Sequence, residues 1–319
     1  MKILVADKYP DKGIASLKSL GCDIVYDPEA KGPALIKLIK DSEAEILVVR
    51  SSQVTAEAMV GSKLKLIVRA GAGYNTIDVK KATELSIYVS NCPGKNSIAV
   101  AELAFGLMLA LDRRIPENVA ALKAGKWNKK EFGKARGLFE RTLGLVGFGF
   151  IGHEMAMRAR AFGMQVLAYD PPLPRKEIIS AGALCCDSLE ELVSLSDIVS
   201  IHVALVPGTR NLINEKVLSH MKPGAFLINT SRAEVVDYDA LAKAMKEKKI
   251  RAGLDVYPNE PAQAAAEFQT PFSSLEGFCG THHIGASTDQ AQEAIADETT
   301  RILKVYLETG RVANQVNRF

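Results

Sequence analysis

Short runs of aliphatic and β-branched residues alternate along the whole chain with segments of helical periodicity. The clearest early runs span residues 46–49, 64–68 and 86–89, and the rhythm returns after residue 141. Strands that alternate with helical segments are typical of βαβ units, in which crossover helices join parallel strands. The sequence therefore predicts an α/β protein built on doubly wound parallel sheets, and 319 residues are enough for two Rossmann-like domains.

The second half of the chain follows this rhythm most regularly. The predicted elements are a helix over residues 151–162 and strands over 143–147, 165–169, 198–203, 226–229 and 252–256. A sheet of six parallel strands would complete a dinucleotide-binding fold. We therefore expect this half of the chain to bind a nucleotide cofactor.

Composition excludes several functional classes. The net charge of +3 is the small difference between 40 basic and 37 acidic residues, which are spread without a basic block, so nucleic acid is not expected as a partner. The amino-terminal apolar run is too short for a signal peptide or a membrane span. The five cysteines show no CxxC spacing, so no metal site is predicted and a reducing cytoplasm is the simplest setting.

A glycine-rich segment follows the first of these strands and opens the predicted helix. Its residues are Gly147, Phe148, Gly149, Phe150, Ile151 and Gly152. This is a GxGxxG pattern in the strand-to-helix context that dinucleotide binding requires. The first glycine permits a tight turn, the second lets the backbone approach a pyrophosphate, and the third allows close packing of helix on strand. The alternative is a turn that needs glycine only for its shape.

A carboxylate ends the next predicted strand. Asp170 follows the run 165–169, where an acidic side chain can accept hydrogen bonds from the adenosine ribose hydroxyls. The same charge would repel a 2′-phosphate, so NAD is favoured over NADP as the cofactor. Arg175 lies a few residues further on and is the nearby residue that would favour the phosphate.

Three polar residues stand just beyond predicted strands. They are Arg232, Glu260 and His283, and ligand sites of open α/β sheets lie at the carboxyl ends of strands. Hydride transfer to a 2-keto acid needs a cation for the carboxylate, a proton donor, and a group that favours the protonated donor. Taken singly, each residue also has an ordinary structural explanation, such as a surface ion pair, a helix cap or a buried histidine. His282 is the alternative to His283.

Three segments around these residues resemble those of the D-isomer-specific 2-hydroxyacid dehydrogenases. They begin at Asn229, Gly253 and His283 and read NTSRAEVVD, GLDVYPNEP and HIGAST. The resemblance implies that Arg232 binds the substrate carboxylate and carbonyl, that His283 is the general acid and base, and that Glu260 pairs with His283. It also implies cofactor contacts from Val203, Thr230, Ser231, Asp255 and Gly285. Ala233 stands where the family usually has glycine, and His282 where it usually has proline.

Within that family the first hundred residues look most like those of phosphoglycerate dehydrogenases. The segments 49–52, 69–73 and 91–97 carry this likeness. It implies that Arg50 meets a substrate phosphate, with an ordinary ion pair as the alternative, and Arg141 is a second candidate only through its nearness to the first nucleotide strand. The further substrate contacts that it implies are Ser51, Ala72, Gly73 and Asn96.

The resemblance also implies the domain organisation and the assembly. Residues 1–98 and 285–319 would form a discontinuous substrate domain, because the C-terminal helix returns to it, and residues 99–284 would form the NAD-binding domain. No additional regulatory domain is expected after that helix. A homodimer would form through the NAD-binding domain, with the apolar segment 99–118 as the candidate contact, although core packing explains that segment nearly as well.

The sequence thus predicts an NAD-dependent oxidoreductase that moves a hydride to or from C2 of a small 2-hydroxy acid. D-3-phosphoglycerate, and with it serine biosynthesis, is the first expectation. A glyoxylate or hydroxypyruvate reductase is the alternative enzyme, since it would share every catalytic residue. An NADH-sensing scaffold that resembles the family's corepressors is the alternative from another class.

Overall fold

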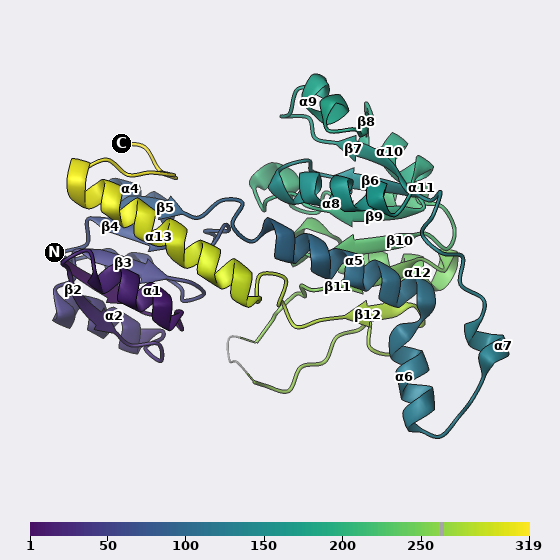
Figure 1. The fold of residues 1–319 in the computed structure, drawn as a ribbon, viewed down its shortest axis with the longest axis horizontal. Coiled ribbons are helices and arrows are strands. Elements are labelled where there is room, and N and C mark those ends of the chain that lie inside the picture. Colours follow the sequence, from purple (N-terminus) through teal and green to yellow (C-terminus); the bar gives the residue numbers. More distant parts are fainter. Residues whose placement is uncertain (262–264) are drawn as a thin grey trace. The chain divides into compact units, whose positions relative to one another are not determined.

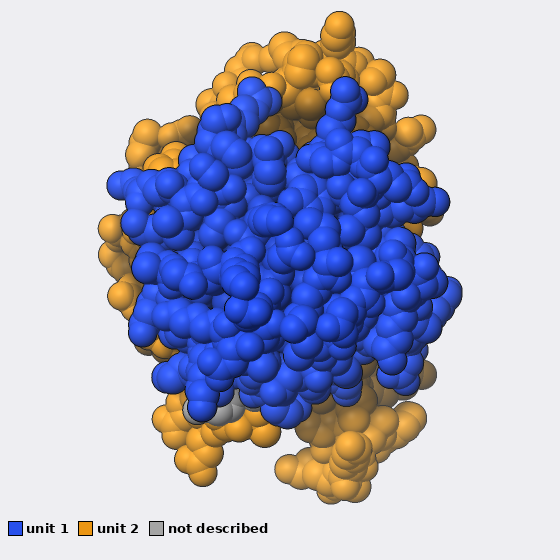
Figure 2. Space-filling model, turned by 90° about the vertical axis from the view of Figure 1, so that its left-hand side faces the viewer, with its two compact units in different colours: residues 1–96, 286–319 blue, residues 97–285 orange. Residues whose placement is uncertain are grey.

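The computed structural model describes residues 1–261 and 265–319 and divides into two compact units (Figure 1). Unit 1 comprises residues 1–96 and 286–319, coloured blue in Figure 2, and unit 2 comprises residues 97–285, coloured orange. Each unit has its own parallel sheet. The predicted α/β architecture with two parallel sheets is therefore confirmed.

Unit 1 is built on a five-stranded sheet in the order β2-β1-β3-β4-β5. Its strands are β1 (Lys2–Val5), β2 (Asp23–Tyr26), β3 (Ile46–Val49), β4 (Leu66–Arg69) and β5 (Tyr88–Asn91). Its helices are α1 (Asp11–Lys18), α2 (Pro33–Ser42), α3 (Ala56–Met59), α4 (Val79–Glu84) and α13 (Asp289–Thr309). The strand order reverses between β1 and β3, which makes the carboxyl ends of these two strands the switch point where such sheets bind ligands.

Alternate residues of the unit 1 strands face opposite sides of the sheet. Leu4 and Leu47 pack in the core that includes α2, whereas Ile3 and Ile46 pack in the core that includes α1 and α13. All four side chains are fully buried, and uninterrupted apolar runs of this kind are typical of parallel strands covered on both faces. Helix α13 thus completes the core of unit 1, although the whole of unit 2 separates it from β5 in the sequence.

Unit 2 is built on a seven-stranded sheet in the order β12-β11-β10-β9-β6-β7-β8. Its strands are β6 (Thr142–Val146), β7 (Gln165–Tyr169), β8 (Leu184–Cys185), β9 (Ile198–Ile201), β10 (Phe226–Asn229), β11 (Arg251–Leu254) and β12 (Phe278–Gly280). Five of these strands were predicted as separate runs, and β8 and β12 were missed because they are short and partly exposed. The switch point of this sheet lies between β6 and β9, as in dinucleotide-binding folds.

Helices cover both faces of the unit 2 sheet (Figure 1). The helices of this unit are α5 (Ser97–Arg113), α6 (Ile115–Lys123), α7 (Lys129–Phe132), α8 (Phe150–Ala161), α9 (Arg175–Ser180), α10 (Leu189–Leu195), α11 (Glu215–His220) and α12 (Tyr238–Lys248), with short 3₁₀ turns η1 (Pro207–Thr209) and η2 (Ala233–Val235). Of these, α6 and α7 extend away from the sheet and contain no buried residue (Figure 1). Leu145 of β6 packs in the core with α5 and α8, whereas Val146 packs in the core with α10, α11 and α12. In the described part of the chain, no helix has the length and apolar character needed to cross a membrane.

Candidate active site

The glycine-rich segment forms the turn between β6 and α8. Gly147 has a φ of +91°, and a Cβ at this position would lie 2.7 Å from the carbonyl oxygen of His202. A Cβ on Gly152 would lie 2.7 Å from the carbonyl oxygen of Gly147. Gly149 caps α8 and has open space where its Cβ would stand. The turn therefore leaves the N-terminus of α8 open to a close approach by a pyrophosphate.

Asp170 lies beside this turn, directly after β7. Its Oδ2 atom accepts a hydrogen bond from the backbone N–H of Phe148 at 2.7 Å. Its Oδ1 atom has no hydrogen-bond partner within residues 1–261 and 265–319, so the carboxylate can still accept ribose hydroxyls. Phe150 and Ile151, which were also expected at the cofactor, begin α8 next to the turn.

Polar atoms are buried where β10 ends. The Oγ1 atom of Thr230 is buried and lacks a hydrogen-bond partner among the residues that the structure describes, a deficit that a bound ligand would remove. Ser231 donates from its backbone N–H and its hydroxyl to Oδ1 of Asn229. Val203, beyond β9, contributes an apolar, partly buried side chain. Together with the glycine turn and Asp170, these residues fit a bound NAD.

His202 directly follows β9 and has no role as a protonated group. Its Nε2 atom lies 2.8 Å from the hydroxyl of Ser200. Burial lowers the pKa of His202 to about 3, so the ring is neutral at physiological pH. It cannot serve as a proton donor there.

The three residues predicted to carry the chemistry all lie in unit 2, beyond the ends of its parallel strands. Arg232 follows β10, Glu260 follows β11 and His283 follows β12. Nδ1 of His283 is 2.6 Å from Oε2 of Glu260, whose Oε1 accepts a hydrogen bond from the backbone N–H of Tyr257 at 2.7 Å. The side chains of His283 and Glu260 are 47% and 30% exposed, so the pair remains accessible to a ligand.

The groups around this pair favour the ionised forms of Glu260 and Arg232. Burial alone would raise the pKa of Glu260, but hydrogen bonds from His283 and Tyr257 and the charge of Arg232 outweigh it and leave that pKa lowered. Burial lowers the pKa of Arg232, and the charges of Glu234 and Glu260 oppose that effect. Because arginine stays protonated in proteins, unit 2 presents a fixed cation beside an ionised carboxylate.

The loop that carries the histidine is held by Asp255. Its Oδ1 atom accepts hydrogen bonds from the hydroxyl of Thr281 at 2.6 Å and the backbone N–H of Ile284 at 2.9 Å, and its Oδ2 atom accepts from the N–H of Gly285 at 2.9 Å. His283 itself has a φ of +53°, a left-handed conformation that is uncommon for residues other than glycine. The sequence predicted Asp255 and Gly285 at the cofactor and missed their part in shaping this loop.

Ala233 stands where the family usually has glycine, yet the loop that carries Arg232 has an ordinary backbone conformation there. Ala233 is buried, begins η2 and has no positive φ. The side chain of Arg232 donates from Nη1 to the carbonyl oxygen of Ser231 at 2.7 Å. A glycine is therefore not required at residue 233 in this chain.

In unit 1, Arg50 and Ser51 lie in the loop after β3, at the switch point of that sheet. Asp7, directly beyond β1, accepts hydrogen bonds from the backbone N–H groups of Arg50, Ser51 and Ser52 at 2.7 to 3.0 Å. It also accepts from the hydroxyls of both serines. Asp7 is buried and was missed in the sequence, although its place at a strand end was a usable signal.

The other predicted substrate residues also belong to unit 1. The guanidinium of Arg50 donates to the hydroxyl of Ser287 at 3.4 Å, and it forms no ion pair with the residues that the structure describes. Ala72 accepts a hydrogen bond at its carbonyl from Nδ2 of Asn91 at 2.6 Å, while Gly73 and Asn96 are half-buried. The predicted site residues thus fall into two groups, one within each unit.

Known proteins match both the sequence and the fold. Residues 105–285 match the family model of the D-isomer specific 2-hydroxyacid dehydrogenase, NAD binding domain. The chain is 40% identical to a D-3-phosphoglycerate dehydrogenase of Methanocaldococcus jannaschii, over 99% of this chain but 59% of that relative, so it spans less than two thirds of that protein. It is 43% identical to a hydroxypyruvate reductase of Thermotoga maritima, over 86% of this chain and 88% of that relative.

A solved structure supports the same assignment. The NAD⁺-bound 3-phosphoglycerate dehydrogenase of Entamoeba histolytica is 28% identical and has a TM-score of 0.83, with 100% of this chain and 99% of that chain covered. The glycine turn, Asp170 and the buried hydroxyl of Thr230 agree with the cofactor bound by that protein. The chain therefore belongs to the D-isomer specific 2-hydroxyacid dehydrogenase family, and residues 105–285 are its NAD-binding domain.

Proposed function

We propose that this protein interconverts D-3-phosphoglycerate and 3-phosphohydroxypyruvate with NAD as the cofactor. The observation that carries the choice of substrate is the loop of Arg50. This guanidinium lacks a carboxylate partner among the described residues, and the backbone that presents it is fixed by Asp7. A planar guanidinium that forms no ion pair with the described residues and extends from a fixed backbone suits a phosphate group.

The chain's own part in the reaction is to hold the acid and move one proton. NAD, when bound, accepts the hydride from C2 of the 2-hydroxy acid or returns it to C2 of the 2-keto acid. Nδ1 of His283 is engaged by Glu260, so Nε2 gives the proton to the carbonyl oxygen in reduction and takes it from the hydroxyl in oxidation. Arg232 would hold the substrate carboxylate through its planar fork.

A hydroxypyruvate or glyoxylate reductase remains the alternative. It would use the same histidine, glutamate and arginine and would differ in the loop after β3, where it has no phosphate to bind. The relative from Thermotoga maritima, named a hydroxypyruvate reductase, is the observation that favours this second candidate.

Substrate preference tests the proposal directly. We would compare kcat/KM for 3-phosphohydroxypyruvate, hydroxypyruvate, glyoxylate and pyruvate in the parent, in Arg50→Ala, and in Arg311→Ala, which removes an exposed arginine of the same unit. We expect a preference for the phosphorylated acid that falls at least about tenfold in Arg50→Ala, through loss of charge-assisted hydrogen bonds, and is unchanged in Arg311→Ala. A preference for an unphosphorylated acid in the parent would instead support the reductase.

Removal of the histidine separates an enzyme from a scaffold that senses NADH. We expect His283→Ala to lower kcat by at least about 10²-fold, because general acid–base catalysis contributes that much or more, while NADH still binds with unchanged affinity. A variant that keeps activity within a few-fold of the parent would refute the assignment of His283.

We also propose that the protein forms a homodimer through α6 and the segment that follows it. The α5 part of the predicted contact, residues 99–118, is largely buried in the core of unit 2. In contrast, Val119 and Leu122 of α6 are exposed, and Trp127 is 81% exposed. Contiguous exposed apolar residues of this size are typical of interfaces. Sedimentation should therefore show a dimer that Leu122→Asp dissociates and Leu195→Asp, at an exposed leucine of α10, leaves intact.

A further inference from the structure

A polar cavity of about 210 Å³ lies at the opposite edge of the unit 2 sheet from the glycine turn. Phe226 and Arg251, the first residues of β10 and β11, line it together with Arg141, which directly precedes β6. All strands of this sheet are parallel, so residues that precede strands share one edge, whereas Gly147 and Arg232, which follow strands, share the other. Strands of four or five residues separate these edges by roughly 13 to 17 Å.

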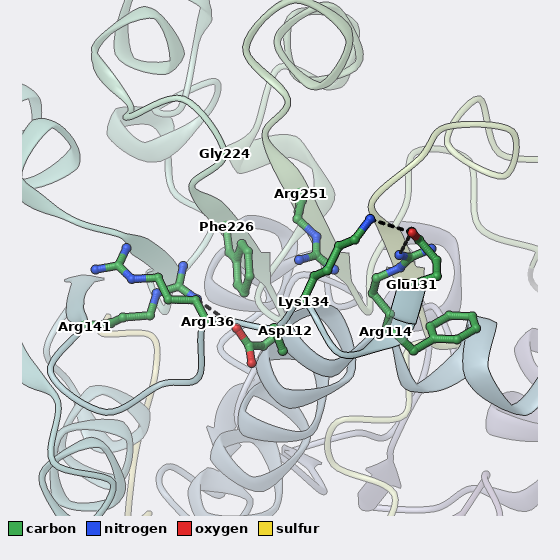
Figure 3. Close-up of a pocket in the computed structure, with 11 residues that line it drawn as sticks. Asp112, Arg114, Glu131, Lys134, Arg136, Arg141, Gly224, Phe226 and Arg251 are labelled. Atoms are coloured by element: carbon green, nitrogen blue, oxygen red, sulfur yellow. Dashed lines mark hydrogen bonds and ion pairs between the residues drawn. The ribbon is translucent and has the colours of Figure 1, made fainter. Parts of the chain in front are cut away.

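Basic side chains dominate the lining of this cavity (Figure 3). Its charged residues are the cations Arg114, Lys134, Arg136, Arg141 and Arg251 and the carboxylates Asp112 and Glu131. The carboxylate of Glu131 forms ion pairs with Nη1 of Arg114 at 2.6 Å and with Nζ of Lys134 at 2.7 Å. Arg251 forms no ion pair with any residue that the structure describes. The cavity therefore holds more positive than negative charge.

Two of these arginines share one aromatic ring. The guanidinium carbon of Arg141 lies 4.3 Å from the centre of the Phe226 ring, and that of Arg251 lies 4.9 Å from it. The side chain of Arg141 is only 4% exposed, and its Nε atom has no hydrogen-bond partner in the described parts of the chain. Burial lowers the pKa of Arg141, and the charges of Asp112 and Asp197 oppose that effect.

Both guanidinium groups are held in place before any ligand arrives. Arg141 donates to Asp112 at 3.3 Å and to the carbonyl oxygen of Asp197 at 3.3 Å, and Arg251 donates to the carbonyl oxygen of Leu111. Arg141 already has an ion pair with Asp112, whereas Arg251 has none among the described residues, and a preorganised planar fork loses little freedom when it binds an oxyanion. An anion that enters the cavity would therefore relieve an existing imbalance of charge.

We propose that this cavity is a second anion site, separate from the catalytic residues, for a small phosphorylated compound or phosphate itself. A phosphate has enough oxygens to engage Arg251, Arg141 and the exposed Lys134 together. The volume is below the range of about 300 to 1,000 Å³ typical of drug-sized ligands, which suits a phosphate on a short carbon chain. The site is independent of which acid the enzyme reduces.

Binding of inorganic phosphate tests the site. We would titrate phosphate into the NADH-saturated protein by calorimetry, with chloride matching the ionic strength, in the parent and in Arg50→Ala, which removes the phosphate ligand proposed for the substrate. We expect saturable binding that is retained in Arg50→Ala. Arg251→Gln should weaken it at least about tenfold through loss of a charge-assisted hydrogen bond, and Arg311→Gln should leave it unchanged.

A second variant guards against a folding defect in Arg251→Gln. Lys134 has a side chain that is 66% exposed, so Lys134→Gln should keep the thermal stability of the parent and still weaken phosphate binding about threefold or more, as expected for a solvent-exposed charge contact. The proposal is wrong if the NADH-saturated parent shows no saturable binding, or if binding disappears in Arg50→Ala. It is also wrong if Lys134→Gln and Arg251→Gln, with unchanged melting temperatures, bind phosphate as the parent does.

Discussion

Nδ1 of His283 lies 2.6 Å from Oε2 of Glu260, and this contact decides which nitrogen of the ring is left for the substrate. The same glutamate is anchored through Oε1 to the backbone N–H of Tyr257. The carboxylate is thus fixed at both oxygens and orients the imidazole. The contact therefore accounts for the orientation of the ring that we propose as the acid and base.

The charge of Glu260 should set the pH dependence of reduction. The pKa of Glu260 is lowered, so the side chain is ionised throughout the neutral range and stabilises the imidazolium form. Glu260→Gln keeps the shape and removes the charge. We expect the pH at which kcat/KM for keto-acid reduction falls to half to move to lower pH by about one unit or more. A pH profile that does not move would contradict this role.

Alanine substitutions at two glycines of the turn should have different effects, one on stability and the other on NADH binding. Gly147→Ala places a Cβ 2.7 Å from a carbonyl oxygen at a φ of +91°, so it should reduce the free energy of unfolding by more than about 1 kcal/mol. Gly149→Ala has open space at a φ of −77° and should fold normally but bind NADH at least about tenfold more weakly, because its methyl group blocks the backbone approach. Thermal denaturation and NADH fluorescence titration measure both, and normal NADH binding by Gly149→Ala would rule out this turn as the pyrophosphate site.

The carboxylate of Asp170 should govern the choice between the two cofactors. Asp170→Asn can still accept the hydrogen bond from Phe148 through its amide oxygen, so it removes the charge and keeps the turn. We expect the ratio of kcat/KM for NADH over NADPH to fall about tenfold, since the repulsion of a 2′-phosphate is gone. If the ratio stays constant in steady-state assays, other residues select the cofactor.

Asp7 should act on the phosphorylated acid through the loop that it holds. Asp7→Ala removes the acceptor of the three backbone N–H groups that fix Arg50. The KM for 3-phosphohydroxypyruvate should rise at least about tenfold, while kcat/KM for hydroxypyruvate changes little. Equal losses for both substrates would indicate a general defect of unit 1 instead. Ser287→Ala, which removes the hydroxyl that Arg50 contacts, is the milder comparison and should raise the same KM by a smaller factor.

Glu298 should contribute to the acid stability of unit 1. Hydrogen bonds from Arg301 and then Asn314 outweigh burial and lower the pKa of Glu298 to about 2. Its contribution is therefore complete above the ordinary pKa of 4.5 and is lost as pH falls toward 2. Urea denaturation should show Glu298→Gln less stable than the parent by on the order of 2 kcal/mol at pH 6, with the gap closing by pH 2. A gap that is the same at both pH values would contradict the expectation.

The strands that the sequence predicts best are those buried on both faces. The predicted bounds of β7 and β10 agree with the structure, because a continuous apolar run between polar turns marks each one. In contrast, β8 and β12 have only two and three residues with partly exposed side chains. Short edge strands are defined by hydrogen bonds to a neighbour, and no local pattern of residues reveals them.

The same contrast, between local sequence patterns and contacts to distant residues, explains which site residues the sequence revealed. His283 and Glu260 stand in recognisable segments after strands, so their pairing was predicted from the sequence. Asp7 and Asp255 both follow strands, which marks them as candidates. The loops that they hold are distant in sequence, such as the loop of Ile284, so no local motif shows which backbone groups they bind. The sequence position of Arg141 makes it a candidate phosphate ligand, but the structure places it at the edge of the sheet opposite to Arg232, Glu260 and His283.

The division of unit 1 into two pieces of chain has a consequence for how the protein is made. Residues 97–285 form one continuous stretch and leave the ribosome together, so unit 2 can fold during synthesis. Residues 1–96 emerge earlier but lack the apolar surface of Ile302 and Leu303, which complete one face of their sheet. Part of that face stays exposed until α13 has been translated, so this sheet is open to association with other apolar surfaces during synthesis.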